Sequence, residues 1–488
     1  MNVWLLLVIA FLVPPLGIVL LWARSRASVT VKLLGSLALL VLSFVHLHWL
    51  FGLRVEVDGT GARPIFSFAA RDRHYEALER SRARQELEAS GSSSRGDVIG
   101  ASPSGLAWPR FRGPSMDGHY PGSIVTRWPD AGLPLLWKQP VGGGYASFVI
   151  AGGRAFTIEQ RRDEEVVAAY DLATGRELWA HGWPAEFRET LGGPGPRATP
   201  TWDDALVFAL GATGELKVLE ESEGRVIWER NILDDASASN LTWGMAASPL
   251  IVDEKVILLP GGSNGNSVVA YDKRSGAAIW SSLDDTQAYT SPMLVTLSGM
   301  PQILVVGARR VMGITVENGS LLWDYPWVTN QGINVAQPVV FDGNRVFLSA
   351  GYGHGATVLE VTQAGSGFSA RPVWSNVRMK NKFTSSVLHD GYLYGLDEAI
   401  LACVEAATGE LQWKGGRYGY GQLLVASGHL VVLTERGELV LVEATPERHA
   451  EVARFQAIEG KTWNHPAIAD GILLVRNANE MAAFRIAP

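Results

Sequence analysis

The chain has 488 residues, of which 47% are hydrophobic and 19% are charged, so it can bury a sizeable core in several domains or in one large array of repeats. Its formal net charge of −7 argues against nucleic acid as a partner. The single cysteine, Cys403, excludes an intrachain disulfide and also zinc or iron–sulfur sites built from several cysteines.

Two apolar segments near the N-terminus predict a membrane anchor. Residues 3–23 and residues 33–53 are each about long enough to cross a bilayer as a helix. Pro14 and Pro15 stand in the middle of the first segment, where proline removes a backbone donor. We therefore expect the first helix to be kinked or to lose hydrogen bonds at this point.

The charges between the two segments predict the orientation of the anchor. Arg24, Arg26 and Lys32 lie in the short connection, and basic residues favour the cytoplasmic side. Residues 1–53 then form a transmembrane hairpin in the inner (cytoplasmic) membrane, with the rest of the chain on the periplasmic, outer side. In the alternative, residues 1–23 are a cleaved signal peptide, but they have no basic N-terminal region and no clear small-x-small cleavage site.

Residues 54–106 are expected to connect the anchor to the main domain. The alternating pattern of residues 54–68 predicts a short strand or hairpin. Residues 70–89 are highly charged with sparse apolar positions, and they predict an exposed helix. This helix could bind a partner, but we favour a solvated spacer. Residues 91–105 are rich in Ser and Gly and predict a flexible linker.

A repeated phrase dominates the remainder of the chain. Residues 167–179 predict a strand, a tight turn with Asp and Gly, and a second strand that ends on Trp179, and residues 269–280 nearly repeat this phrase. The aromatic residues that end such strands are Trp137, Trp179, Trp228, Trp280, Trp323, Trp374, Trp413 and, in degenerate form, Phe455. Because they recur every 39–52 residues, we predict an all-β propeller with one four-stranded blade per repeat.

The two ends of the propeller domain are expected to complete one blade together. The last strand, residues 481–486, is the third of its blade and lacks a fourth, whereas residues 133–137 form an aromatic-ended strand without the three before it. Their pairing gives eight blades and removes an open sheet edge. The propeller then occupies residues 107–488, and the Pro- and Gly-rich lead-in at residues 108–118 is expected to pack on it.

The motif Ala-x-Asp-x-x-Thr-Gly-x-x-x-Trp resembles the tryptophan-docking repeat of the pyrroloquinoline-quinone (PQQ) propeller superfamily. Residues 169–179 and 270–280 carry it, the first shifted by one residue, and the resemblance extends over about residues 108–488. It implies a structural docking role for the seven tryptophans. Some members of the superfamily are periplasmic quinoprotein dehydrogenases, and others, similar to the propeller lipoprotein of the outer-membrane assembly machine, are scaffolds without a cofactor.

The connections between blades hold the candidate binding residues. In a propeller, the loop from the outermost strand of one blade ends near the axis, at the mouth of the channel. Aromatic and polar side chains that converge there are typical of a ligand pocket and also of a protein-binding face. The alternative is that the loops only pack on one another. The candidates are Trp183, Arg197, Asn240, Trp243, Gln337, Lys382, Tyr418, Tyr420, Trp463 and Asn464.

The charges of these loops predict an electrically divided mouth. The early loops contain Asp234, Asp235, Asp284 and Asp285. The late loops contain Arg378, Lys380, Lys382, Lys414, Arg417 and Lys461. The basic half could hold an anionic group, such as the carboxylates of a quinone.

The residues expected for quinone catalysis are incomplete. Similar dehydrogenases hold PQQ with a calcium ion, a carboxylate base and usually a disulfide between adjacent cysteines. Cys403 alone cannot form that disulfide, and no spacing of carboxylates and amides marks a calcium cage. Asp324 could be a base, although a single Asp in a loop is usually a turn residue.

We therefore favour a membrane-anchored binding or scaffold module of the cell envelope, with an envelope protein as its partner and without an assigned metal or cofactor. One alternative is a PQQ-dependent quinoprotein dehydrogenase that oxidises alcohols or sugars with PQQ and calcium. A second alternative is glycan or polymer binding at the aromatic mouth. Fold resemblance does not by itself choose among these functions.

Overall fold

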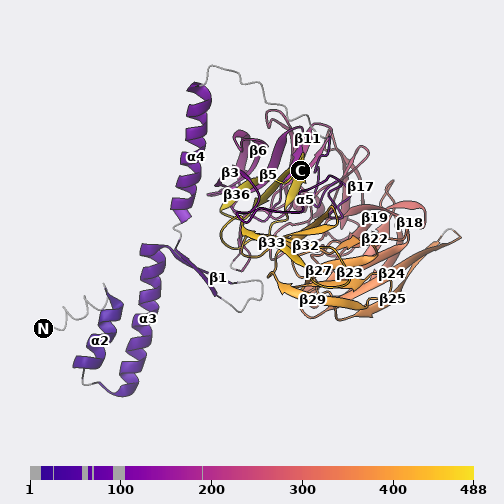
Figure 1. The fold of residues 1–488 in the computed structure, drawn as a ribbon. Helices are drawn as coiled ribbons and strands as arrows, with labels where there is room; N and C mark the ends of the chain where they lie inside the picture. Colours follow the sequence, from indigo (N-terminus) through magenta and orange to yellow (C-terminus); the bar gives the residue numbers. More distant parts are fainter. Residues whose placement is uncertain are drawn as a thin grey trace. The chain divides into compact units, whose positions relative to one another are not determined.

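A computed structural model describes residues 13–25, 27–57, 64–68, 71–91, 105–189, 191–365 and 367–488. The chain divides into two compact units, residues 1–77 and residues 78–488. The first unit contains α2 (Pro14–Arg24), α3 (Val29–Phe51), β1 (Leu53–Val57) and β2 (Pro64–Phe68) (Figure 1). The helix α4 (Arg71–Gly91) begins in the first unit and continues into the second.

In the first unit, α2 packs against α3, and a hairpin follows α3. Trp22 Nε1 donates a hydrogen bond to Ser36 Oγ at 2.9 Å, which joins the two helices. The strands β1 and β2 pair antiparallel, from Leu53 opposite Phe68 to Val57 opposite Pro64. The expected hairpin after the apolar segments is therefore confirmed.

The prediction of two complete membrane spans is not borne out in the described residues. Among them, only the window Val29–Trp49 in α3 is long and apolar enough to cross a membrane, by length and composition. α2 has 11 residues and starts at Pro14, since proline fits the first turn of a helix, where its missing N–H is not needed. Among the described residues, the two prolines thus stand in the first turn of this helix. Residues 3–12 of the predicted first span lie outside the described residues.

The second unit is a propeller of eight four-stranded antiparallel sheets (Figure 1). Blade 1 contains β4 (Val149–Ala151), β5 (Arg154–Arg161), β6 (Glu164–Asp171) and β7 (Glu177–Pro184). Blade 2 contains β10 (Thr201–Asp203), β11 (Leu206–Leu210), β12 (Glu215–Glu220) and β13 (Val226–Asn231). Blade 3 contains β14 (Leu250–Val252), β15 (Lys255–Leu258), β16 (Val268–Asp272) and β17 (Ala278–Ser282). Blade 4 contains β18 (Met293–Leu297), β19 (Met300–Val306), β20 (Arg310–Ile314) and β21 (Leu321–Pro326).

The remaining blades follow the same order, and the first strands of neighbouring blades contact one another around the axis. Blade 5 contains β22 (Val339–Phe341), β23 (Arg345–Ala350), β24 (Gly355–Ala364) and β25 (Gly367–Asn376). Blade 6 contains β26 (Val387–His389), β27 (Tyr392–Asp397), β28 (Ile400–Glu405) and β29 (Leu411–Arg417). Blade 7 contains β30 (Gln422–Ala426), β31 (His429–Leu433), β32 (Glu438–Glu443) and β33 (Glu451–Gln456). The connections between blades contain β8 (Arg188–Glu189), β9 (Gly193–Pro194), α5 (Ile232–Ala236) and the 3-10 turn η1 (Asn330–Gly332).

Blade 8 is built from both ends of the propeller, as predicted. It contains β34 (Ala467–Ala469), β35 (Ile472–Arg476), β36 (Glu480–Arg485) and, as its outermost strand, β3 (Leu135–Pro140). β3 pairs antiparallel with β36, and Lys138 lies opposite Ala482. Figure 1 shows the purple β3 beside the yellow β36, although the two strands lie far apart in the sequence. The eight-bladed propeller closed by an N-terminal strand is thus confirmed.

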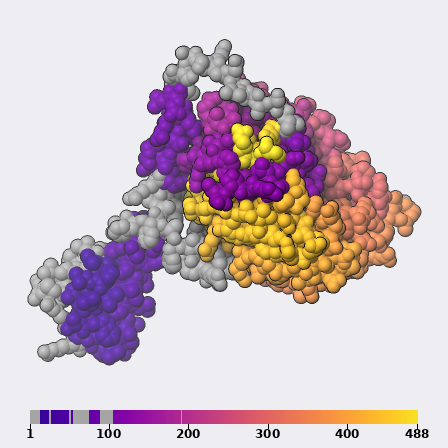
Figure 2. All heavy atoms as spheres, viewed as in Figure 1, coloured from indigo at the N-terminus to yellow at the C-terminus, as the bar shows by residue number. Residues whose placement is uncertain are grey.

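The lead-in, residues 105–134, packs on the propeller and joins blades that are far apart in the sequence. Trp108 is fully buried and forms an antiparallel bridge with Ile150 in blade 1. The backbone N–H of Tyr120 donates to Val425 O in blade 7 at 2.9 Å. In Figure 2 the lead-in is the purple band against the yellow C-terminal residues. This segment therefore covers the propeller, as the sequence predicted.

Tryptophan side chains on the outermost strands join each blade to the next in most of the ring. Trp137 Nε1 donates to Leu172 O at 3.0 Å, and a Cβ atom on Gly175, whose φ is +73°, would lie only 2.5 Å from the Trp137 ring. The Gly of the repeated turn therefore provides both the left-handed backbone and the space for the tryptophan of the preceding blade. Equivalent bonds join Trp179 to Glu221 O, Trp228 to Lys273 O, Trp374 to Ala406 O and Trp413 to Thr445 O.

Two tryptophans depart from this pattern. Trp323 Nε1 donates within its own blade, to Gln302 Oε1 at 2.7 Å. Trp280 Nε1 is buried and has no hydrogen-bond partner among the described residues. The same residue type at the same place in the repeat therefore contributes different interactions.

Near the axis, a belt of side-chain hydrogen bonds passes from blade to blade. At the start of the inner strands of blades 1 to 5, a backbone N–H donates to a side-chain oxygen of the next blade at 2.7–3.0 Å. The belt consists of Ser147, Thr199, Ser248, Ser291, Gln337 and Ser385, in that order. Small polar residues open these strands because they both fit the narrow axis and satisfy the backbone of the neighbouring blade.

The docking bonds can be tested with two matched substitutions. Trp228→Phe removes a hydrogen bond to Lys273 O, whereas Trp280→Phe removes an indole N–H that has no partner. Trp228→Phe should therefore lower the free energy of unfolding by about 1 kcal/mol more than Trp280→Phe. The measurement is urea-induced unfolding followed by fluorescence. Equal losses for the two variants would mean that the docking bonds contribute no net stability.

Candidate functional site

One end of the propeller gathers most of the loops that could form a site. Because neighbouring strands are antiparallel, the turn between the second and third strands of a blade lies at the same end as the connection to the next blade. We call this end the mouth. The lead-in contacts the opposite end, since Ile150 and Val425 lie toward the ends of first strands that start at the mouth.

Aromatic and cationic side chains from these loops contact one another around the mouth. The Tyr145 and Trp463 rings are nearly parallel, with centroids 5.2 Å apart, and the Phe383 ring lies 4.6 Å from Trp463. Trp243 and Tyr289 form a second contact at 5.7 Å. We define the mouth ring as Tyr145, Arg197, Trp243, Tyr289, Lys382, Phe383, Tyr420 and Trp463.

The lysines of the mouth lie over aromatic rings. Lys382 Nζ lies 4.4 Å from the centroid of Tyr352 and 5.0 Å from that of Tyr420. Lys461 Nζ lies 4.6 Å from the centroid of Trp463. A desolvated cation over an aromatic face gains up to about 2 kcal/mol. These contacts therefore hold the loops of several blades together at the mouth.

Arg197 lies between two aromatic rings. Its guanidinium carbon is 5.6 Å from the centroid of Tyr145 and 4.6 Å from that of Phe187, and its Nη2 donates to Gly193 O at 2.9 Å. Burial lowers the pKa of Arg197 to about 10, although nearby Tyr145 and acidic groups act in the opposite direction. Arg197 thus stays charged at neutral pH while its described hydrogen bonds go to backbone carbonyls.

The ten predicted site residues divide into three groups. Arg197, Trp243, Lys382, Tyr420 and Trp463 belong to the mouth ring. Asn240, Gln337 and Asn464 instead hold the backbone of their surroundings, through bonds to Ala212 O, Ser291 O and Ala146 O. Their side-chain amides therefore stabilise the backbone of the loops and inner strands around them.

The other two predicted residues point elsewhere. Trp183 lies in β7 and not in a loop, because the strand continues to Pro184 by pairing with β6. Its side chain is only 6% exposed and packs in the core between blades 1 and 2. The Tyr418 hydroxyl donates to Glu451 Oε2 at 2.8 Å and contacts His449 Nε2 at 2.7 Å. Tyr418 is thus directed to the outer part of blade 7.

Several mouth residues were missed from the sequence. Tyr145 and Phe383 belong to predicted connections, but their rings were not singled out. Tyr352, Glu398 and Glu435 come from turns between second and third strands. Glu435 accepts from Trp463 Nε1 at 2.9 Å, and Glu398 accepts from the Tyr420 hydroxyl at 3.1 Å. The strand order was the signal that could have found them, because it places the turns between second and third strands at the same end of the propeller as the connections between blades.

Local ion pairs involve several of the residues behind the predicted electrical division of the mouth. Asp397 pairs with Lys380 and, at 2.5 Å, with Lys414. Burial would raise the pKa of Asp397, but the hydrogen bonds from the two lysines outweigh it and lower the pKa. On the acidic side, Asp285 pairs with Arg309 at 2.9 Å. Lys380 and Lys414 of the basic loops and Asp285 of the acidic loops are therefore compensated nearby.

The residues do not fit a quinone held by calcium. Among the described residues, no group of three or more His, Cys, Asp or Glu side chains could hold a metal ion. Cys403 is fully buried inside blade 6, and Asp324 lies on the outermost strand of blade 4, where it pairs with Arg310 at 2.8 Å. The thiol does not reach the mouth, and the carboxylate of the candidate base is paired with Arg310. At the aromatic mouth, Tyr145 and Phe383 pack against the Trp463 ring.

Glu165 is a buried carboxyl group between blades 1 and 2. Its Oε1 accepts from the backbone N–H of Ala212 at 2.9 Å, and its Oε2 has no hydrogen-bond partner among the described residues. Burial raises the pKa of Glu165 from 4.5 to about 7, with a smaller contribution from Glu215. The folded protein therefore keeps a proton on Glu165 in a pH range where the unfolded chain has lost it.

Comparisons with known proteins show which proteins this chain is similar to. The sequence profile of the family described as "Outer membrane protein assembly factor BamB" matches residues 162–415, slightly more than half of the chain. The outer membrane protein assembly factor BamB of Bordetella pertussis is 19% identical over 314 residues, which are 61% of this chain and 72% of that protein.

Solved structures share the fold at low sequence identity. The crystal structure of BamB from Moraxella catarrhalis superposes with a TM-score of 0.51 at 14% identity, over 73% of this chain and 98% of that chain. The quinohemoprotein alcohol dehydrogenase ADHIIG from Pseudomonas putida HK5 superposes with a TM-score of 0.56 at 12% identity, over 78% of this chain and 80% of that chain. At this identity the similarity shows the fold and not the activity.

The protonation of Glu165 gives a pH-dependent prediction. Since its folded pKa is raised, its ionisation costs stability as the pH rises from about 4.5 to about 7. The free energy of unfolding of Glu165→Gln relative to the wild type should therefore increase by about 3 kcal/mol between about pH 4 and about pH 8. The measurement is urea unfolding at both pH values.

The neighbouring Glu164 provides a matched control for this prediction. Glu164 is exposed on the same strand, so Glu164→Gln should leave the difference between the two pH values unchanged. If Glu165→Gln showed the same stability relative to the wild type at both pH values, Glu165 would not carry the raised pKa.

Proposed function

The chain belongs to the family of the outer membrane protein assembly factor BamB, and on this premise we propose that its propeller is a membrane-anchored scaffold that binds other proteins of the cell envelope. The family description supports a role in the envelope. α3, which is long and apolar enough to cross a membrane, supports an anchor. The basic residues before α3 favour an anchor in the inner membrane with the propeller on the periplasmic side.

Exposed apolar side chains at the mouth carry this proposal. Val328 is 65% exposed, Val377 is 69% exposed and Tyr352 is 37% exposed, and all three belong to mouth loops that meet at blade 5. We define them as the blade-5 patch. Apolar and aromatic side chains that stay open to solvent around one loop are typical of protein-binding surfaces.

Contacts between neighbouring loops connect the members of this patch. Trp327, next to Val328, packs edge-on against His354 with ring centroids 4.6 Å apart. A Cβ atom on Gly355 would lie 2.9 Å from Val377 Cα, so Val377 borders the same loop. Lys382 of the mouth ring lies over Tyr352. The blade-5 patch is therefore continuous with the mouth ring, which holds its loops in place.

The proposal predicts position-specific crosslinks in intact cells. A photo-reactive benzoylphenylalanine introduced at Val377 or Tyr352 should form adducts with one or a few envelope proteins, which mass spectrometry would identify. The same group at Val452, which is 42% exposed on the outer strand β33, should not form them. Because Val452 is exposed but does not lie at the mouth, it controls for adducts that depend on exposure alone.

A second substitution tests whether the adduct depends on the patch. Val328→Glu places a charge within the blade-5 patch and should reduce the adduct formed from position 352 by about tenfold, because a desolvated apolar contact would be lost. Adducts of equal yield from Val377 and Val452, or an adduct that Val328→Glu leaves unchanged, would contradict a binding role for this surface.

A further inference from the structure

Helix α4 packs one face against the propeller, although its sequence predicted a solvated spacer. Leu78 is 2% exposed and Arg82 is 8% exposed, whereas Leu87 is 72% exposed. Leu78, Arg82 and Gln85 lie one and two helical turns apart, on one side of the helix. The packed face therefore contains one leucine and two polar side chains, which is why the sequence shows no amphipathic pattern.

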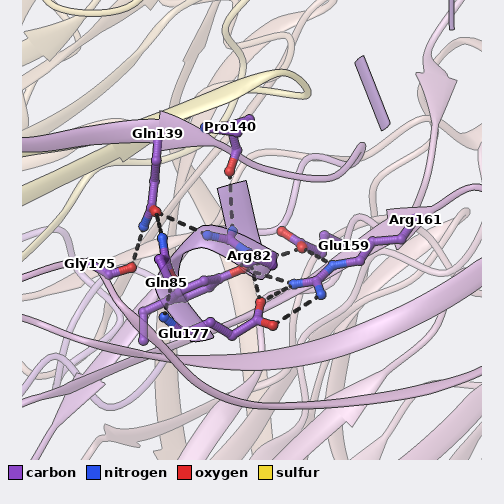
Figure 3. Close-up of polar contacts among 9 residues, drawn as sticks. Arg82, Gln85, Gln139, Pro140, Glu159, Arg161, Gly175 and Glu177 are labelled. Carbon is purple, nitrogen blue, oxygen red and sulfur yellow. Dashed lines mark hydrogen bonds and ion pairs between the residues drawn. The ribbon is translucent and has the colours of Figure 1, made fainter. Parts of the chain in front are cut away.

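Arg82 reaches the seam between blade 8 and blade 1 (Figure 3). Its Nη1 donates to Gln139 Oε1 at 3.0 Å and its Nη2 donates to Pro140 O at 3.2 Å, both on the closing strand β3. On the blade 1 side, Nη2 also donates to the Tyr170 hydroxyl at 3.2 Å, and Nε lies 3.1 Å from Glu177 Oε2. One guanidinium group therefore contacts both blades that meet where the ring closes.

Gln85 adds a second connection at the same seam. Its Nε2 donates to Gln139 Oε1 at 2.7 Å, and its Oε1 accepts from the backbone N–H of Glu177 at 3.0 Å. That N–H belongs to β7, the outer edge strand of blade 1. Gln139 also donates to Gly175 O in blade 1. Through Gln85, the helix thus accepts a hydrogen bond from a backbone N–H at the edge of blade 1 and also donates one to the Gln139 side chain of β3.

The charges of the seam are balanced without the helix. Glu177 pairs with Arg161, and Arg161 pairs with the buried Glu159 at 2.6 Å. Burial would raise the pKa of Glu159, but Arg161, Arg476 and Arg82 outweigh it and lower the pKa. The two arginines and two glutamates of the propeller therefore compensate one another. Departure of α4 would not leave a buried charge without a partner, which is the usual cost of breaking a buried ion pair.

We propose that this seam is a docking site specific for an arginine-bearing helix, that α4 occupies it in this chain, and that the docked helix holds the closing strand β3 against blade 1. The guanidinium group provides the specificity, because four acceptors on two blades surround its three nitrogens in one place. α4 continues from the unit that contains α3. Its docking therefore links the state of the membrane-proximal segment to the closure of the propeller, independently of any partner at the mouth.

Hydrogen exchange of the full-length chain in detergent micelles tests this site. In Arg82→Ala, the amides of β3 and β36 should exchange about tenfold faster than in the wild type, the factor expected from the loss of one charge-assisted hydrogen bond. The amides of blade 3, which does not contact the helix, should exchange at an unchanged rate and show that the propeller is folded. Glu79→Ala, which removes only an exposed ion pair between α4 and Arg162, is the matched control.

Two further measurements test the specificity for a guanidinium group. Arg82→Lys should resemble Arg82→Ala, since one ammonium group cannot satisfy acceptors on both blades. Methylguanidinium added at millimolar concentration should slow the exchange of β3 in Arg82→Ala, whereas methylammonium should not. Unchanged exchange of β3 and β36 in Arg82→Ala, or acceleration of equal size in all blades, would overturn the proposal. Wild-type exchange in Arg82→Lys would overturn the specificity for arginine.

Discussion

The propeller is held shut by the pairing of β3 with β36, because a ring of sheets closes only when the last sheet gains a strand from the other end of the chain. The lead-in strengthens the same region, since the N–H of Val125 donates to Ile486 O at 2.8 Å just after β36. α4 adds contacts to β3 through Arg82 and Gln85. The C-terminal strands of the closing blade are therefore supported by β3, the lead-in and α4, all of which precede them in the sequence. The tryptophan bond that most blades have is an additional contact.

The blades are joined at two distances from the axis. Inner strands share the belt of hydroxyl and amide hydrogen bonds that begins at Ser147, and outer strands place a tryptophan against the Gly-containing turn of the next blade. The belt lies where inner strands start at the mouth, whereas the tryptophan contacts lie at the turns between third and fourth strands, at the opposite end. Gln337 belongs to the belt and Asn464 donates to Ala146 O beside it, so two side chains that could have faced a ligand hold the inner strands instead. The mouth is consequently rigid where it meets the blades, which is the condition for presenting a surface to a partner.

The mouth divides into an internal part and an external part. The internal part is the mouth ring, in which cations such as Lys382 lie over aromatic faces and bind loops to one another. The external part is the blade-5 patch, where Val328 and Val377 stay open to solvent. Family membership and a fold shared with a dehydrogenase at 12% identity do not distinguish a scaffold from an enzyme. The distinction between a scaffold and an enzyme rests on which side chains of the mouth reach the surface.

The repeats could be derived from the residues alone, because the turn chemistry, the alternation of the strands and the recurring tryptophans are local properties. The closure could also be derived, since the strand count was complete only if residues 133–137 joined the C-terminal strand. The roles of individual side chains required the folded structure. Tyr418 turns toward His449, and Arg82 finds its acceptors 57 and 88 residues away, in Gln139 and Tyr170. Such contacts depend on which segments become neighbours in space, and no local pattern around a single arginine encodes that proximity.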